Sequence, residues 1–383
     1  MFSESHPVFR RMIRFLMLPY CYYKLNWKEC RRNPFVVLFD FLYLFFVLKT
    51  YPDNYGSCRL WEISRENWKF YYGSGYHPYQ RQRLRKKVQR HEYRILFNDK
   101  VVCEQLCKGI GVALPVTVGF IWQSNDSRGV LERIFAKTSQ RKLIIKPITG
   151  RAGMGIVLAE KTGDGIVIIQ RENQTIPFDK YVLKEAAIVQ ELIVQDSRMA
   201  QISDTSVNTI RVLTIMTETN DSVIVSATAR FSANSEAYID NWSAGGVAVG
   251  VNCQTGYLMK FAFDKVGNRY THHPVSGILF EGFQIPEWEK ILVTARKVQN
   301  AFPFYRLIGM DIAIAKDGIP VLIEVNASTD LIFQEQTSGP LLANKEILKI
   351  FSKYGLLVAK SQITMAKSSF KESLKRRGAK SVN

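Results

Sequence analysis

The chain has 383 residues, of which 46% are hydrophobic and 12% aromatic, so it can bury a large core without disulfide bonds or a structural metal. The formal net charge of +18 favours anionic partners such as lipid head groups, polyanionic glycans or nucleotide phosphates. We do not expect nucleic acid as a partner, because neither an aromatic-interleaved strand motif nor a recognition helix accompanies the charge. The cysteines show neither a CxxC pair nor zinc-ligand spacing, which predicts reduced thiols in a cytoplasmic protein.

Residues 1–95 form a basic region that we predict to be helical. Apolar side chains recur at helical spacing from Phe9 to Tyr20, with arginines between them, and an apolar run from Phe35 to Leu48 follows. This run contains Asp40 and is shorter than the ~20 residues that a membrane-spanning helix needs. One interpretation is peripheral attachment to the anionic inner face of a membrane, and the other is a helical lobe packed on the main domain.

The next segment connects this region to the first predicted strand. We expect an irregular connection over residues 51–79 and then a basic helix from Arg81 to Arg90. Asn98-Asp99-Lys100 has the composition of a helix N-terminus, and the chain is expected to return as a strand over residues 111–117.

A glycine-containing loop follows an apolar strand predicted over Lys142 to Pro147. The loop from Thr149 to Gly155 contains three glycines, so its successive backbone N–H groups can form an anion-binding nest. Lys146 and Arg151 add positive charge to it. The loop is not a Walker A motif, and the chain has no GxGxxG dinucleotide fingerprint.

Further strands carry polar side chains where apolar ones would be expected. One strand is predicted over Ile188–Ile193, and two more, over Ser206–Ile215 and Ser222–Phe231, carry Arg211 and Arg230. An arginine on a strand that faces a cleft binds carboxylate or phosphate well, and the alternative is a salt bridge at the rim of the sheet.

The stretch from Leu307 to Asn326 predicts a β-hairpin with a turn at Lys316-Asp317-Gly318. Asp311 and Glu324 lie in its two strands, and a buried carboxylate needs a cation or a donor beside it. Asn326 is two residues from Glu324 and therefore points to the same face. Three such oxygen ligands suit Mg²⁺ or Mn²⁺, and the alternative is a solvated hairpin face.

The C-terminal part is predicted to be helical before a basic tail. We expect helices over Pro286–Ala301 and Glu346–Tyr354 and a helix start within residues 329–339. The tail after Ala359 is rich in Lys, Arg and Ser and is expected to be mobile.

Taken in order, these segments resemble ATP-grasp enzymes, and most closely the sugar-transfer-associated ATP-grasp family found with polysaccharide biosynthesis. They are more distantly similar to glutathione synthetase and the ribosomal-protein glutamate ligases. The resemblance runs from about residue 98 to about residue 342. The matching segments are NDK at 98–100, IIKPITGRAGMGI at 144–156, VQELI at 189–193, SVNTIRVLT at 206–214, NWSAGGVAVGV at 241–251, HPVSG at 273–277, IGMDIAI at 308–314 and LIEVN at 322–326.

The resemblance implies an α/β (α+β) ATP-grasp fold that holds the nucleotide between two α+β lobes. It would occupy residues 96–355, with a lid-like subdomain at about 141–193, between the helical basic N-terminal region 1–95 and the basic tail 356–383. It implies phosphate contacts from Lys100 and Lys146, a phosphate-covering loop and an adenine-holding hinge. The loop residues are Thr149, Gly150, Arg151, Gly153, Met154 and Gly155, and the hinge residues are Gln190, Glu191, Leu192 and Ile193.

The remaining implied roles concern the ribose, the metal and the acyl group. Asp196 is the nearest candidate to grip the ribose. The resemblance assigns Asp311, Glu324 and Asn326 to Mg²⁺ or Mn²⁺, and Arg211, Arg230 and Asn241 to the acyl phosphate or the incoming carboxylate.

These roles imply an ATP-dependent, ADP-forming carboxylate–amine ligase that acts on a sugar acid or glycan precursor, with an amino acid or amine as second substrate. One alternative is a kinase that transfers the phosphate to a sugar hydroxyl. The other is a non-catalytic nucleotide-binding scaffold of a glycan assembly complex.

Overall fold

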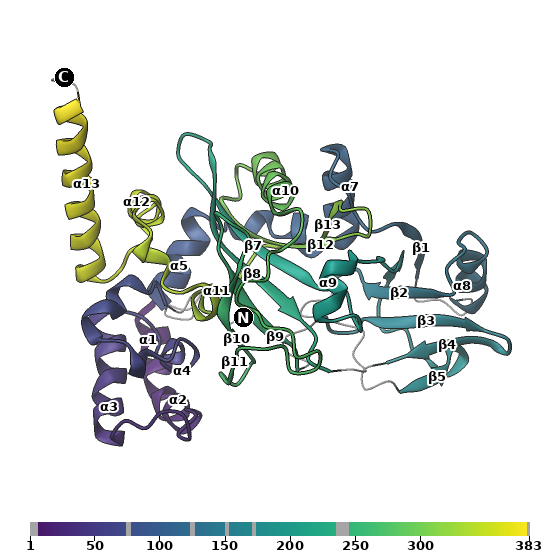
Figure 1. Ribbon diagram of the computed structural model, residues 1–383, viewed down its shortest axis with the longest axis horizontal. Helices are drawn as coiled ribbons and strands as arrows, with labels where there is room; N and C mark the ends of the chain where they lie inside the picture. Colours follow the sequence, from purple (N-terminus) through teal and green to yellow (C-terminus); the bar gives the residue numbers. More distant parts are fainter. Residues whose placement is uncertain are drawn as a thin grey trace.

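The computed structural model describes residues 7–73, 78–122, 127–149, 153–170, 174–234 and 245–380 (Figure 1). Its strands are β1 (Thr117–Ile121), β2 (Lys142–Pro147), β3 (Val157–Thr162), β4 (Gly165–Ile169), β5 (Thr175–Pro177), β6 (Ala187–Glu191), β7 (Thr209–Met216), β8 (Ser222–Phe231), β9 (Val247–Val251), β10 (Leu258–Phe263), β11 (Arg269–Tyr270), β12 (Leu307–Ile314) and β13 (Pro320–Asn326).

The α-helices are α1 (Pro7–Leu16), α2 (Leu18–Tyr23), α3 (Pro34–Leu42), α4 (Asp53–Ser57), α5 (Pro78–Lys87), α6 (Ile95–Asn98), α7 (Lys100–Gly109), α8 (Ser127–Phe135), α9 (Ser197–Ile202), α10 (Trp288–Ala301), α11 (Leu331–Ser338), α12 (Lys345–Lys353) and α13 (Lys360–Lys380). A π-helix, η2 (Tyr43–Val47), continues α3. The 3₁₀ turns are η3 (Leu60–Glu62), η4 (Arg65–Phe70), η5 (His91–Tyr93), η7 (Phe178–Lys180) and η9 (Leu341–Ala343).

The smaller of two antiparallel sheets has the order β1-β6-β2-β3-β4-β5. Helix α8 packs on it, because Leu131 and Ile134 share a buried cluster with Leu143 and Ile145 of β2. This sheet and its helix lie at the right end of the molecule in Figure 1.

The larger sheet has the order β11-β10-β9-β8-β7-β12-β13. Successive side chains of a strand point to opposite faces. On β7, Ile210 and Val212 pack with α10, whereas Leu213 and Ile215 pack with α12 on the other face. The second face is apolar at one end of β7 and polar at the other, and the polar end carries Arg211.

The N-terminal helices pack around a separate hydrophobic core. Phe41, Tyr55 and Trp68 are buried in one cluster, which also includes Ala359 from the C-terminal part of the chain. The connection over residues 51–79, expected to be irregular, contains α4 and short 3₁₀ turns in its described part.

One prediction about regular structure is wrong, and one helix was not predicted. The strand expected over residues 111–117 begins only at Thr117, after a segment without regular secondary structure that contains Pro115, which has no N–H to donate. Within the tail, which we predicted to be basic and mobile, helix α13 spans Lys360–Lys380. Ala366 is buried, and Gln362 Nε2 donates to Tyr71 O at 2.9 Å, so the N-terminal region stabilises the start of this helix.

Candidate active site

The acidic residues of the C-terminal hairpin lie side by side. β12 and β13 pair antiparallel, and their register places Asp311 opposite Glu324 and Gly309 opposite Asn326. Gly318 has a φ of 75° in the connecting turn, a conformation that favours glycine. The turn sets the register as far as Ile312, and a register shift between Asp311 and Ile312 then places Asp311 opposite Glu324.

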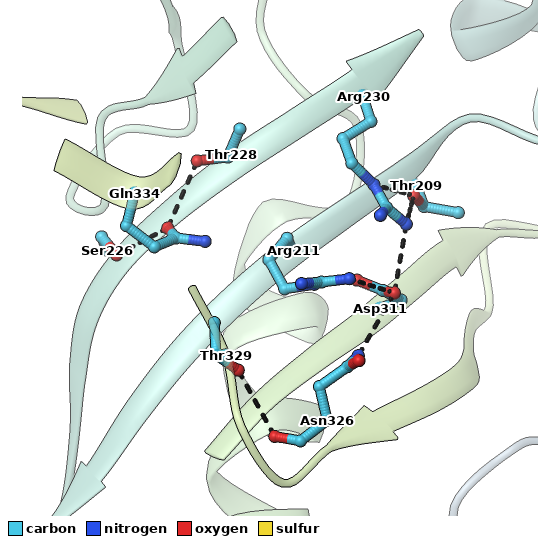
Figure 2. A network of polar contacts seen from close by, with 9 residues as sticks. All are labelled: Thr209, Arg211, Ser226, Thr228, Arg230, Asp311, Asn326, Thr329 and Gln334. Carbon is cyan, nitrogen blue, oxygen red and sulfur yellow. Dashed lines mark hydrogen bonds and ion pairs between the residues drawn. The ribbon is translucent and has the colours of Figure 1, made fainter. Parts of the chain in front are cut away.

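Two arginines from neighbouring strands hold Asp311 (Figure 2). Arg211 on β7 lies beside it in the sheet; its Nε donates to Oδ1, and its Nη2 donates to Oδ2 at 2.7 Å. Arg230 on β8 makes an ion pair with the same carboxylate at 3.1 Å, while its Nε donates to Thr209 Oγ1 at 2.9 Å. Burial alone would raise the pKa of Asp311, but the charges of Arg211 and Arg230 lower it, so this carboxylate stays ionised.

Glu324 lies in the opposite electrostatic situation. Burial and the charge of Asp311 raise its pKa, against the opposing charges of Arg211 and Lys100. Within the described residues, its carboxylate makes no hydrogen bond and no ion pair. A half-buried carboxylate beside a second one calls for a cation between them.

The donors of the hairpin fit a hard divalent cation. Asp311, Glu324 and Asn326 offer two carboxylates and one amide oxygen, the ligand type that Mg²⁺ and Mn²⁺ prefer. No group of three or more His, Cys, Asp and Glu side chains in the described part of the chain could hold a metal ion. An ion at this hairpin would therefore complete its coordination with water and with phosphate oxygens.

Two lysines flank these carboxylates. Lys146, near the end of β2, is only 9% exposed and lines the same cleft as Asp311 and Glu324. Lys100 begins α7, and its Nζ donates to Pro147 O at 2.8 Å. Burial lowers the pKa of Lys100, although the charge of Glu324 opposes this. The two amines are thus partly desolvated, a state in which an anionic ligand is bound more strongly.

The segment after β6 lines the opposite wall of the cleft. Leu192 N donates to Gln140 Oε1 at 2.9 Å, and Gln140 Nε2 donates to Leu192 O at 3.1 Å. Gln140 therefore fixes both backbone groups of Leu192, between Glu191 and Ile193. Sequence reasoning missed Gln140, and no local signal marks it, because its partner lies 52 residues away in the chain.

The cleft runs between the two sheets and encloses about 950 Å³, counting the part that is open to solvent. Residues of β2 and the β6 end form one side, and residues of β7, β8, β12 and β13 form the other. The predicted residues that line it are Lys146, Gly153, Glu191, Leu192, Ile193, Arg211, Arg230, Asp311, Glu324 and Asn326.

A family model described as "Sugar-transfer associated ATP-grasp" matches residues 79–350. The chain belongs to this family. Its sheets and helices form a mixed α/β ATP-grasp fold, as the sequence predicted. No curated protein matches the chain.

Solved structures of ATP-grasp ligases are similar to this family member at low sequence identity. The D-Ala:D-Ser ligase VanG from Enterococcus faecalis is 14% identical, with 68% of this chain and 62% of that chain covered and a TM-score of 0.40. D-alanine–D-alanine ligase from Helicobacter pylori is 10% identical, with 71% and 64% covered and a TM-score of 0.41. The ATP-grasp ligase PsnB complexed with minimal precursor, Mg and ADP is 15% identical, with 70% and 62% covered and a TM-score of 0.36. This chain spans less than two thirds of the length of each.

The structure of this ATP-grasp chain separates some predicted residues from the cleft. Lys100 and Gln190 line an adjoining pocket that shares Lys146 and Glu324 with it. Gln190 Nε2 donates to Thr117 Oγ1 at 3.2 Å and to Glu104 Oε2 at 3.3 Å, so its side chain is occupied within the protein. Because Gln140 occupies both backbone groups of Leu192, the hinge prediction is left with the backbone of Glu191 and Ile193.

The covering loop is only partly described. Met154 and Gly155 line a different pocket, on the β3–β5 side, and Thr149 is exposed and donates to Glu185 Oε2 at 2.6 Å. Gly150, Arg151 and Asn241 lie outside the described residues.

Asp196 does not line the cleft. Its side chain caps α9 by accepting from Arg198 N at 2.8 Å, and it forms an ion pair with the Arg198 guanidinium at 2.7 Å. The sequence Asp196-Ser197-Arg198 before a short helix carries the N-cap signal that explains this position. The structure thus gives no support to Asp196 as a ribose contact.

Proposed function

We propose that this chain is an ATP-dependent carboxylate–amine ligase that forms ADP and acts on a sugar acid or glycan precursor. The observation that supports it best is the gathering of Lys146, Arg211, Arg230 and the Asp311–Glu324 pair around one cleft. Such a set offers positive charge for phosphates and for a carboxylate, and two carboxylates for a metal ion. The family assignment to sugar transfer motivates the substrate class.

The chain's own residues would bind and orient the reactants. Lys100 and Lys146 would hold the nucleotide phosphates. The backbone of Glu191 and Ile193, on either side of the Leu192 that Gln140 fixes, would hold the adenine. Asp311, Glu324 and Asn326 would hold Mg²⁺ or Mn²⁺, which when bound would neutralise charge on the phosphates. Arg211 and Arg230 would orient the substrate carboxylate, for which a guanidinium fork is well shaped.

The reaction then proceeds in two steps. A carboxylate oxygen attacks the γ-phosphorus of ATP, the bond from this phosphorus to ADP breaks, and an acyl phosphate forms. Positive charge from the lysines and arginines stabilises the negative charge that accumulates in the transition state. The amine then attacks the acyl carbon, a C–N bond forms, phosphate leaves and the amine releases a proton. Exclusion of water protects the acyl phosphate from hydrolysis.

The test is ADP formation with Mg²⁺ and ATP against panels of uronic acids, amino sugars and amino acids. The ligase hypothesis expects turnover that requires a carboxylate and an amine together. Glu324→Gln should abolish it, whereas Glu289→Gln, an exposed site on α10, should leave it unchanged. ADP formation with a sugar and no amine would instead indicate a kinase, and nucleotide binding without any turnover would indicate a scaffold.

A further inference from the structure

The first helix turns its apolar side chains to solvent and its arginines to the protein. Phe9, Met12 and Leu16 on α1 are 51%, 59% and 74% exposed. The Arg11 guanidinium lies 5.7 Å from the ring centroids of Phe45 and Phe46, and that of Arg14 lies 5.5 Å from Tyr51. A surface helix normally does the reverse, burying its apolar face and solvating its charges.

Helix α3 and η2 extend the same kind of surface. Phe35 and Phe39, one helical turn apart, are 74% and 65% exposed, and Phe46 on η2 is exposed as well. The ring of Phe15 on α1 lies 5.6 Å from that of Phe46, so the exposed side chains of the two segments meet. We call this set the outer apolar surface. It consists of Val8, Phe9, Met12, Phe15, Leu16, Phe35, Val36, Leu38, Phe39, Phe46 and Val47.

Asp40 adds no negative charge to the outer apolar surface, because its side chain points into the protein. Its carboxylate is fully buried, accepts from the Tyr55 hydroxyl at 2.8 Å and pairs with Arg32 and Arg65. The acidic residue inside the apolar run is thus neutralised by the protein. The exposed side of α3 remains free of acidic residues.

Positive charge borders the outer apolar surface. Helix α5 packs beside α1 and exposes Arg83, Lys86 and Lys87. In the segment from α2 to α3, the exposed basic residues are Lys24, Lys28 and Arg31. Anionic lipid head groups complement such a border, because each basic residue near the surface contributes about 1 kcal/mol of attraction. The exposed Tyr20 and Tyr23 are of the aromatic type that is enriched at membrane interfaces.

We propose that the outer apolar surface inserts into the interface of an anionic membrane, with α1 and α3 lying on the bilayer. No helix among the described residues is long and apolar enough to cross a membrane, so the attachment is to one face only. The basic border around an apolar face argues for an anionic lipid surface as the occupant, because both features match the interface of such a membrane. The proposal is independent of the reaction in the cleft.

Sedimentation of the full chain with vesicles tests the proposal. We expect binding to vesicles of phosphatidylcholine with phosphatidylglycerol and much weaker binding to phosphatidylcholine alone. Met12→Glu and Leu16→Glu should each lower the partition coefficient about 10-fold, because they remove apolar area and add a charge that anionic lipid repels. Lys86→Glu with Lys87→Glu should lower it on anionic vesicles only. The matched control is Val293→Glu on α10, which has the same 59% exposure as Met12.

Other outcomes overturn the proposal. They are a wild-type chain that does not sediment with anionic vesicles, binding that survives Leu16→Glu, and an equal loss in Val293→Glu. A concentration-dependent dimer that Leu16→Glu dissociates, without vesicle binding, would assign the surface to a second copy of the chain. Thermal unfolding followed by circular dichroism checks that each variant is folded.

Discussion

Asp311 in the cleft and Asp40 in the N-terminal helices are both buried aspartates that pair with arginines. They differ in how exposed these arginines are and in whether a second carboxylate lies nearby. Each pairs with two arginines, and each is almost inaccessible to solvent. The arginines of Asp311 are both 14% exposed, whereas Arg32 and Arg65 beside Asp40 are 34% and 47% exposed. Only Asp311 faces a second carboxylate, that of Glu324.

This difference separates a binding site from a structural ion pair. Asp40 receives a hydroxyl donor and two arginines that also reach water, so its charge is fully compensated without a ligand. Around Asp311, the arginines are largely desolvated and Glu324 has no donor within the described residues, so the two facing carboxylates call for a cation between them. A buried acidic residue alone therefore does not indicate function. At Asp311, the feature that indicates a binding site is the second carboxylate, Glu324, which faces it.

Among the changes that test this comparison, we expect Asp311→Asn to have the largest effect on ADP formation. The change keeps the shape but removes the charge that faces Glu324 and holds Arg211 and Arg230. We expect ADP formation to fall by about 10²–10³-fold, as for loss of one charge-stabilising group in an active site. Steady-state ADP release measures it.

Asp317→Asn in the turn of the same hairpin is the matched control and should change turnover less than about twofold, because Asp317 is exposed. Equal activity of Asp311→Asn and the wild type would make Asp311 a structural residue like Asp40.

A third buried carboxylate, Glu335 on α11, sharpens the comparison because it pairs with no arginine in the part of the chain that the structure describes. It accepts from the backbone amides of Tyr72 at 2.6 Å, Gly73 at 2.9 Å and Leu341 at 3.3 Å. Burial raises its pKa to about 7. The folded state therefore holds the proton more tightly than the unfolded state between about pH 4.5 and 7, and the unfolding free energy should fall by roughly 3 kcal/mol as pH rises through this window.

Urea unfolding at low and high pH measures this change. Glu335→Gln carries no titrating proton and should remove this part of the pH dependence, whereas the exposed Glu346→Gln should keep it. Identical pH dependence in Glu335→Gln and the wild type would mean that Glu335 is ionised in the folded state.

For Asp40→Asn we expect a stability effect without an activity effect. The exposed arginines can be solvated when the carboxylate charge is lost, so the free energy of unfolding should fall by about 2 kcal/mol, less than for a fully buried pair. Denaturant unfolding measures it, with the exposed neighbour Glu66→Gln as control. A comparable loss of ADP formation would show that the N-terminal helices take part in the reaction.

The sequence predicted the features that depend on residues close together in the chain. The hairpin, its turn and the proximity of Asp311 and Glu324 follow from the twenty consecutive residues 307–326. The strands that carry Arg211 and Arg230 follow from their own local sequence. It did not predict that Arg211 pairs with Asp311, because the pairing of β7 with β12 joins residues 100 positions apart. Nor did it predict which face of α1 is exposed, since that depends on where Phe45 and Tyr51 lie. The helix in the tail was missed because its buried side chains pack against distant segments.

The smallest expected effect concerns the two facing carboxylates themselves. Arginines lower the pKa of Asp311, whereas burial and the charge of Asp311 raise that of Glu324. A metal ion binds the deprotonated form, so protons should compete with Mg²⁺ at Glu324 above the pH range of an ordinary glutamate. The Mg²⁺ concentration for half-maximal nucleotide binding should rise as pH falls, approaching about tenfold per pH unit below the pKa of Glu324. Glu324→Gln should bind weakly with no such slope. A wild-type requirement that stays flat as pH falls to about 5 would contradict the raised pKa and would make Glu324 as fully compensated as Asp40.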